Sequence, residues 1–310
     1  MTLLMDDEFN VTYITLVGYE EMGKYRYLLF FIMFIVYILT ICFSFIIVCV
    51  IWIHKNLHEP MYIFIAALLV NSIACCTTLY PKLLVNFLSE KQIISYSACL
   101  LQCFLYYTFC ASDFFLLSAM AYDRYVSICK PLQYPVIMTK TIVSIMLGLA
   151  WLVPACQVAV PIILSANVKL CHLTLDAIFC NNSVYSLHCV PSKERSIFDM
   201  FSLVSMALLP LLFILFTYTR ILIISYRSGR EVRKKAAQTC LPHLLVLICF
   251  SCLCGYDIIV IHLEVRSDIH SIMTLQAFLY YPLFNSVIYG LKMKEITKPL
   301  KKFFCRTKAI

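Results

Sequence analysis

Long apolar stretches constrain this chain more than any other feature of its sequence. Seven stretches carry few charges and run for about 20 residues or more, the length at which an α-helix crosses the hydrocarbon core of a membrane. These stretches are 25–53, 60–88, 97–127, 141–163, 197–226, 238–262 and 269–291. The chain is 62% hydrophobic and 14% charged, whereas soluble domains are roughly half apolar and one-quarter charged. We therefore expect an all-α membrane protein built as a seven-transmembrane helix bundle.

The positive charges are unevenly placed along the chain, and their placement predicts its orientation. Of the 25 Lys and Arg residues, 17 fall on the side that holds the connections after the first, third and fifth stretches and the tail after the seventh. Connections rich in Lys and Arg stay in the cytoplasm. We expect a plasma-membrane protein with an extracellular tail over 1–24, a helical domain over 25–291 and a cytoplasmic tail over 292–310. This distribution accounts for the net charge of +8, so no nucleic acid partner is expected.

The expected outer side carries two glycosylation sequons. Asn10 begins Asn-Val-Thr in the first tail, and Asn181 begins Asn-Asn-Ser in the connection after the fourth stretch. Both fit an extracellular position, where such sequons are modified. The first 24 residues are acidic and lack a basic segment before a short apolar core, so we expect no cleavable signal peptide and an uncleaved first helix as anchor.

The 17 cysteines divide into two groups. Most, including Cys249, Cys252 and Cys254, lie within the apolar stretches, where a cysteine behaves as a small apolar residue, so no metal site is expected. Four lie on the expected outer side, where an oxidising environment favours disulfides. These are Cys99, Cys171, Cys180 and Cys189. Four cysteines allow three pairings, and the sequence alone leaves all three open.

Neither an enzyme nor a transporter is well supported by the residues. His243 and His262 have no Ser or Asp partner at workable spacing, and six Gly residues form no phosphate-binding loop. We expect no catalytic residue, no cofactor and no enzyme activity. A small-solute transporter would show internal repeats or several charges within the membrane. Only Asp113 and Asp257 stand out there, so a transporter is the weaker alternative.

Five short motifs follow one another along the chain. Residues 57–62 read LHEPMY and 120–129 read MAYDRYVSIC. A looser Ser-Tyr pair follows at 225–226, then KKAAQTCLPHL at 234–244 and PLFNSVIY at 282–289. In this order they resemble the signatures of the olfactory receptors, within the rhodopsin-like (class A) G-protein-coupled receptors. Glu59 and the third stretch resemble fish-type members most.

This resemblance implies an odorant receptor that activates a heterotrimeric G protein, of the olfactory stimulatory type that raises cAMP. In the family the Asp of the MAYDRY box pairs with its Arg at rest, and the Arg meets the G protein after the sixth helix swings outward. The resemblance therefore assigns Asp123 and Arg124 to a latch, and Tyr218 and Tyr289 to tyrosines that move inward on activation. The coupling residues that it implies are Asp123, Arg124, Tyr125, Tyr218, His243, Asn285 and Tyr289.

The family also ties its third helix to the second extracellular loop. By resemblance the expected disulfides are Cys99–Cys180 and Cys171–Cys189.

Two positions depart from the family pattern. Ser72 stands where the second helix of most such receptors carries Asp, and Ser286 follows Asn285 where NPxxY has Pro. Both positions belong to the family's sodium pocket. We hypothesise that Asp113, with Ser72 and Asn285 nearby, forms a reduced polar site that is either protonated or holds a cation.

A ligand of such a bundle would bind between the outer halves of the third, fifth, sixth and seventh helices. Spacing from the motifs and from Pro210 gives the candidate ligand residues Tyr106, Tyr107, Cys110, Ala111, Ser202, Met206, Cys254, Gly255, Ile258, Leu275 and Phe278. Tyr106 occupies the place of the acid in amine receptors, which disfavours an amine hormone. This set suits a small, weakly polar odorant. The charges expected near the mouth leave charged aqueous ligands as an alternative, and these charges are Lys82, Asp257, Glu264 and Arg266. The alternative is a class A receptor that works outside olfactory tissue on a metabolite or peptide.

The tail after Tyr289 carries an apolar stripe against a basic face. Met293, Ile296, Leu300 and Phe303 follow helical spacing, which predicts a short amphipathic cytoplasmic helix on the anionic membrane lipid. Cys305 is a candidate for lipidation by palmitoyl. The resemblance further implies a location in the cilia of olfactory sensory neurons.

Overall fold

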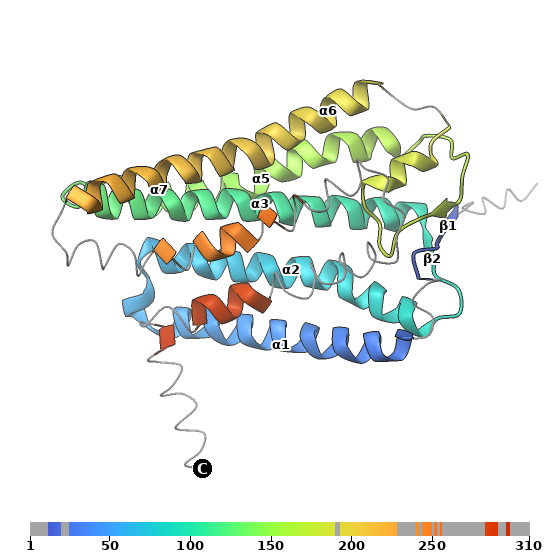
Figure 1. Cartoon of the computed structure of the whole chain (residues 1–310), viewed down its shortest axis with the longest axis horizontal. Helices are drawn as coiled ribbons and strands as arrows, with labels where there is room; N and C mark the ends of the chain where they lie inside the picture. Colours follow the sequence, from blue (N-terminus) through green and yellow to red (C-terminus); the bar gives the residue numbers. More distant parts are fainter. Residues whose placement is uncertain are drawn as a thin grey trace, which may run out of the picture.

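In the computed structural model of the chain, long helices run side by side (Figure 1). The structure describes residues 12–19, 25–189, 193–227, 240–241, 244–249, 251–252, 255, 283–290 and 296–297. The long helices of this part are α1 (Arg26–Ile53), α2 (Pro60–Leu88), α3 (Tyr96–Cys129), α5 (Lys140–Ser165) and the continuous run of α6 (Lys193–Leu203), η4 (Val204–Leu208) and α7 (Leu209–Arg227). Within the described residues, these make five helices that are long and apolar enough to cross a membrane.

Three short helices and three strands complete the described elements. The helices are η2 (Lys55–Leu57), α4 (Tyr134–Ile137) and η3 (Asn182–Leu187), and the strands are β1 (Tyr13–Leu16), β2 (Ile93–Ser95) and β3 (Thr174–Leu175). Of the expected sixth and seventh stretches, the described residues 240–241, 244–249, 251–252, 255 and 283–290 are helical. The helical prediction is confirmed over these residues.

The helix faces that point away from the bundle are apolar. Phe31 and Phe45 on α1, Ile163 on α5 and Phe216 on α7 are all exposed. In water such surfaces would be costly, whereas a lipid bilayer solvates them and requires every spanning backbone to satisfy its own hydrogen bonds, as a helix does. The chain is therefore a multi-pass membrane protein.

Helix α3 is the centre of the bundle. It packs against α2, α5 and α7, and Figure 1 shows it running between α2 and the pair formed by α5 and α7. Its inward positions are buried along its whole length, from Cys103 through Leu116 to Met120. Residues on α3 can therefore link events at the two ends of the bundle.

The helices begin at residues suited to that position. Ser95 caps α3 by accepting a hydrogen bond from the Ala98 amide at 3.3 Å, and Thr139 caps α5 by accepting one from the Ile142 amide at 3.4 Å. Pro60 opens α2, where its missing N–H has no intrahelical acceptor to lose. Such caps satisfy amides that would otherwise lack a partner.

A small sheet, which the helical prediction did not include, closes one end of the bundle. Strand β1 lies between β2, with which it is antiparallel, and β3, with which it is parallel. Residues 12–19 of the expected tail are therefore part of the fold. In β1 exposed and buried residues alternate, and the buried ones, Ile14 and Leu16, pack beneath the strand. We call this end the sheet end, and the opposite end, where α3 finishes, the Arg124 end.

The fifth transmembrane helix starts earlier than expected. Its expected start was residue 197, but α6 begins at Lys193. A π-helical turn over Val204–Leu208 then precedes Pro210. Proline lacks an amide hydrogen and its ring clashes with the carbonyl four residues before it, so a wider turn at this point relieves the clash.

Candidate functional site

A cavity of about 260 Å³ lies at the sheet end of the bundle. It is enclosed by α3, by α5, by the connection that holds η3, and by α6 with η4. Most of the side chains around it are apolar or aromatic, among them Phe114, Ile162, Phe179 and Phe198. Cavities of this kind, with a few polar groups, are the usual form of a small-molecule site.

Six of the eleven candidate ligand residues lie in the lining of this cavity. They are Tyr106, Tyr107, Cys110, Ala111, Ser202 and Met206. The first four share one face of α3, because residues at i, i+1, i+4 and i+5 point the same way from a helix. Gly255 is described as helical and is not among the lining residues. The others, Cys254, Ile258, Leu275 and Phe278, lie outside the described residues.

The tyrosines of the lining are fixed by the connection above them. The Tyr107 hydroxyl accepts a hydrogen bond from the Asn182 amide at 3.0 Å. The Phe179 ring meets the Tyr106 ring edge to face, with centroids 5.2 Å apart. Phe179 was missed in the sequence, because nothing in a loop sequence says which side chain will point into a bundle.

Two opposite charges also border the cavity. Arg195 donates from Nε to Asp199 at 2.9 Å, and its guanidinium lies 3.3 Å from the centroid of the Tyr185 ring. The i, i+4 spacing of an acid and a base on a helix is a signal that could have identified this pair. The cavity lining therefore combines mostly apolar side chains with a few polar and charged ones, which suits a small molecule with one polar group.

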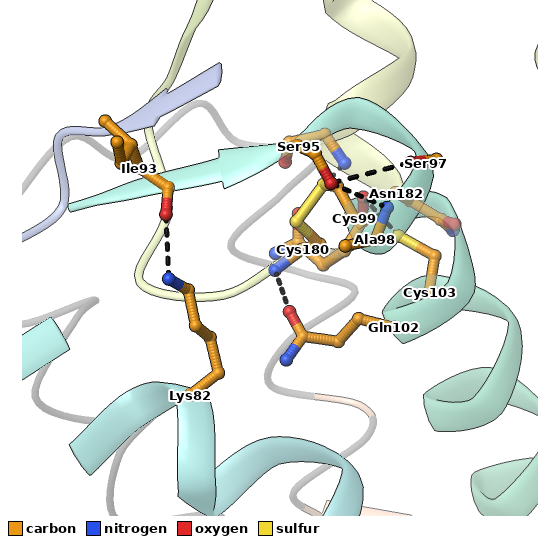
Figure 2. Close-up of a disulfide and its surroundings, with 12 residues drawn as sticks. Lys82, Ile93, Ser95, Ser97, Ala98, Cys99, Gln102, Cys103, Cys180 and Asn182 are labelled. Carbon is orange, nitrogen blue, oxygen red and sulfur yellow. Dashed lines mark hydrogen bonds between the residues drawn. A yellow bond between two sulfur atoms is a disulfide. The ribbon is translucent and has the colours of Figure 1, made fainter. Parts of the chain in front are cut away.

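Two disulfides fasten the connection over the cavity. Cys99 is joined to Cys180, and Cys171 to Cys189, which are the pairings implied by the resemblance. Figure 2 shows the first bond beside Gln102, whose Oε1 accepts a hydrogen bond from the Cys180 amide at 3.0 Å. The segment next to Phe179 is therefore held to α3 by a covalent bond and a hydrogen bond.

Asn181, a predicted glycosylation site, lies in the cavity lining. Its Oδ1 caps η3 by accepting a hydrogen bond from the Ser183 amide at 3.0 Å. Asn181 is partly exposed, and its glycosylation stays a prediction. Asn10, the other predicted site, lies outside the described residues.

Two groups of hydrogen bonds lie at the expected ion site. Asp113 accepts a hydrogen bond from Asn71 Nδ2 at 2.8 Å, and Asn71 Oδ1 accepts one from Trp151 Nε1 at 2.9 Å. Separately, Asn285 Nδ2 donates to Ser72 Oγ at 3.1 Å. Asn71 was missed in the sequence, where it reads only as the neighbour of Ser72.

The departure at Ser286 also has a structural partner. Its hydroxyl lies 2.7 Å from the hydroxyl of Ser44, in the buried contact between α1 and the helical residues 283–290. A proline at this position would lose this hydrogen bond. Within the described residues, no three or more His, Cys, Asp or Glu side chains converge as metal ligands.

The Arg124 end carries an ion pair between the two residues that the resemblance assigns to a latch, Asp123 and Arg124. Arg124 donates from Nε to Asp123 Oδ2 at 3.0 Å, and both side chains are buried at the end of α3. The other carboxylate oxygen, Oδ1, accepts a hydrogen bond from the Tyr134 hydroxyl of α4 at 2.8 Å. Burial, and then the Asp123 charge, raise the pKa of Tyr134 above its usual value, so this hydroxyl keeps its proton and donates.

The other residues of the expected coupling set lie elsewhere in the described bundle or outside the described residues. Tyr218 and Tyr289 are buried, and the Tyr218 hydroxyl has no hydrogen-bond partner within the described residues. Tyr125 is partly buried on α3. A second cavity, of about 600 Å³, lies between the end of α7 and Cys240, Leu241 and Leu244. His243 and Cys305 lie outside the described residues, as does the expected tail helix apart from Ile296 and Thr297.

Comparisons with known proteins agree along almost the whole chain. A family model described as "Olfactory receptor" matches residues 32–307. "Olfactory receptor 2A12" of Homo sapiens is 31% identical over 98% of this chain and 100% of its own length. "Olfactory receptor 6Y1" of Homo sapiens is 29% identical over 98% and 95%, and "Olfactory receptor-like protein OLF4" of Canis lupus familiaris is 29% identical over 97% and 98%.

Proposed function

The chain belongs to the olfactory receptor family, and we propose that it binds a small odorant in the cavity at the sheet end. It then activates a heterotrimeric G protein at the Arg124 end. The chain is a receptor and not an enzyme. The observation that carries the proposal is one central helix, α3, that lines the odorant cavity with Tyr106 and Tyr107 and ends in the buried Asp123–Arg124 pair.

The cavity favours a compact, mostly apolar odorant. Its volume of about 260 Å³ lies just below the range of roughly 300–1,000 Å³ that holds drug-sized ligands. Aromatic side chains such as Phe114, Phe179 and Tyr106 would bury the apolar part. Hydroxyls of Tyr107 and Ser202 would orient one polar group, with the Arg195–Asp199 pair near the rim.

Activation would release the latch at the opposite end. Asp123 holds Arg124 and accepts from Tyr134, which keeps the Arg124 guanidinium from the G protein at rest. An outward movement of the helix that contains Cys240 and Leu244 would open the second cavity further, and Tyr218, buried beside it, would turn toward Arg124. His243, Asn285 and Tyr289 belong to the same proposed coupling set. The G protein proposed is the stimulatory type that raises cAMP.

The proposed orientation puts the sheet end outside the plasma membrane, in the cilia of olfactory sensory neurons. The Lys and Arg distribution and the disulfides at the sheet end support it. Glycosylation at Asn10, palmitoylation of Cys305 and the contact of the tail helix with anionic lipid belong to this proposal. The relatives reported are mammalian, and the closer resemblance to fish-type receptors stays a prediction.

A cAMP assay with pooled volatile and water-soluble odorants tests the proposal in cells that also express the olfactory G protein. Tyr107→Ala is expected to lower the potency of an active odorant by about tenfold or more, because an aromatic side chain of the cavity lining is lost. Leu101→Ala is the matched control, since Leu101 lies on the same helix and is exposed away from the cavity.

Arg124→Ala is expected to abolish the cAMP response while odorant binding persists. Arg26→Ala, at the opposite end of the bundle, is its control and should leave the response intact. Equal surface amounts of all variants are required. Silence of the wild-type receptor at confirmed surface expression would contradict the odorant proposal, and solute uptake without G-protein dependence would favour a transporter instead.

A further inference from the structure

The first described residues of the chain are fastened to the connection that covers the cavity. The Thr15 amide donates to the Leu173 carbonyl at 2.8 Å, and the Val17 amide donates to the Leu175 carbonyl at 3.0 Å. On its other edge, β1 pairs with β2. The buried side chains of Ile14 and Leu16 add an apolar contact beneath the strand. Residues 13–17 are therefore part of the outer cover of the bundle.

The two residues after this segment contact the backbone of Ala177 and Ile178. A Cβ placed on Gly18 would lie 2.7 Å from the carbonyl carbon of Ala177 and 3.0 Å from the Ile178 nitrogen. Only glycine lets the two backbones approach so closely. The Tyr19 hydroxyl donates to the Ile178 carbonyl at 2.7 Å, and its ring meets Phe87 edge to face at 5.3 Å.

The residues that follow Ile178 reach the cavity. Phe179 lines it and packs on Tyr106, and Cys180 is fixed to α3 by its disulfide and by Gln102 (Figure 2). The segment 177–180 is therefore held from two sides. Its far end is held by α3, and its near end is held by Gly18 and Tyr19.

We propose that Gly18 and Tyr19 are positioning residues for odorant recognition. They set the place of the Ala177–Ile178 backbone and, through it, the height of the Phe179 ring above the cavity. This inference rests on the proposed function, since it assigns these residues to the same site. In a cavity of about 260 Å³, a small displacement of one aromatic wall changes the length of molecule that fits, because well-packed walls leave few gaps.

The first test is Gly18→Ala, with Gly148→Ala as its control. A Cβ on Gly18 must push the backbone of 177–178 away, whereas a Cβ on Gly148 meets nothing within 4 Å. The readout is the EC50 for a series of odorants of one chemical type and increasing length. Gly18→Ala is expected to change the EC50 by about tenfold for some lengths and to alter their rank order.

The second test removes the Tyr19 hydroxyl, which donates to the Ile178 carbonyl and accepts a 3.4 Å hydrogen bond from Asn86 Nδ2. Tyr19→Phe keeps the ring against Phe87 but loses both bonds, and we expect an EC50 change of about fivefold or more, since one such bond contributes about 1 kcal/mol. Tyr13→Phe is the control, because Tyr13 lies on the same segment with its side chain 56% exposed. Both controls are expected to match the wild-type receptor.

A measurement without odorant separates this inference from the proposed function. In purified receptor, amide hydrogen exchange over residues 173–180 should be faster in Gly18→Ala and Tyr19→Phe than in the controls. A wild-type receptor silent to all odorants would overturn the proposed function and the role in recognition with it. A responsive wild type with unchanged EC50 values in both variants would overturn this inference alone, whether or not exchange is faster.

Discussion

The Tyr134 hydroxyl donates a 2.8 Å hydrogen bond to Asp123 Oδ1, while Arg124 is bonded to Oδ2 of the same carboxylate. One carboxylate therefore joins the end of α3 to the short helix α4. Hydrogen bonds to an ionised group are stronger than neutral ones. Because Asp123 is fully buried, the Tyr134 bond also helps to keep its charge in place beside Arg124.

Tyr134→Phe is expected to raise basal activity. The variant keeps the ring but removes one donor from Asp123, which weakens the resting latch by about 1–2 kcal/mol and shifts the resting equilibrium several-fold toward the open state. Basal cAMP without odorant, normalised to surface amount, measures the effect. Tyr122→Phe, on α3 beside Asp123, serves as the control. Equal basal cAMP in Tyr134→Phe and wild type would contradict the shared latch.

The residues that the sequence could identify are those whose neighbours are set within one helix. Tyr106, Tyr107, Cys110 and Ala111 follow from helical spacing counted back from the MAYDRY motif, and the structure finds them in one lining. The spans were predictable for the same reason, since length and apolar character determine a membrane helix. The bounds of α1 and α2 differ from the expected ones by one residue or less.

The residues that the sequence could not identify depend on contacts between distant segments. Phe179 reaches the cavity because the loop around it is fixed by Cys99 and by β1, and Tyr134 reaches Asp123 because α4 folds back on α3. A single strand of four residues such as β1 has no stability alone and forms only when β2 and β3 pair with it. No local pattern carries this information.

Trp151→Phe is expected to destabilise the receptor modestly. It removes the indole donor to Asn71, which in turn bonds Asp113, and one buried hydrogen bond contributes about 1 kcal/mol. The midpoint of thermal unfolding in detergent should fall by a few degrees. The chain has two Trp residues, and the other, Trp52, is 78% exposed, so Trp52→Phe is a matched control. Equal midpoints for the two variants would contradict a structural role of this bond.

Asp113→Asn tests the proposed ion site directly. If Asp113 binds a cation, the substitution should abolish any dependence of odorant potency on sodium, because the negative charge that would hold the cation is gone. The assay compares EC50 values in sodium and in choline buffers of equal ionic strength. Ser72→Ala provides the comparison for the neighbouring Asn285 bond. Unchanged signalling and unchanged sodium sensitivity in Asp113→Asn would exclude the site.

The two disulfides are expected to differ in importance. A disulfide stabilises the folded state by lowering the conformational entropy of the unfolded chain. The stabilisation is about 4.5 kcal/mol for Cys99–Cys180, which closes a loop of 81 residues, and about 3 kcal/mol for Cys171–Cys189, which closes a loop of 18. The first pair is also buried against Phe179, while the second is exposed. The double Cys→Ser change at 99 and 180 should abolish the odorant response, and that at 171 and 189 should only weaken it. Equal losses would contradict this ranking.

Protonation of His188 is expected to make the stability of the connection over the cavity depend on pH. The Tyr96 hydroxyl lies 2.9 Å from the Ser165 carbonyl and 2.9 Å from His188 Nε2. A hydroxyl has one proton, so when Tyr96 donates it to Ser165, the neutral imidazole donates from Nε2 to the Tyr96 oxygen. Burial, and then the positive charge of Arg195, lower the pKa of His188 below its usual 6.5. The Tyr185 ring also faces the imidazole.

Acid is therefore expected to destabilise the fold around His188, because burial and the positive charge of Arg195 disfavour a charged imidazole, although its Nε2 still donates to Tyr96. Because the folded pKa lies below the unfolded one, the unfolded state binds more protons just below pH 6.5, so stability is fully present above about pH 6.5 and falls as the pH drops toward the folded pKa. Thermal midpoints should decline from pH 7.5 to pH 5.5, and His188→Gln should flatten the decline by removing the titrating group. His172→Gln, on the exposed part of the same connection, should keep the wild-type slope. A slope in His188→Gln equal to that of the wild type would assign the acid sensitivity to another group.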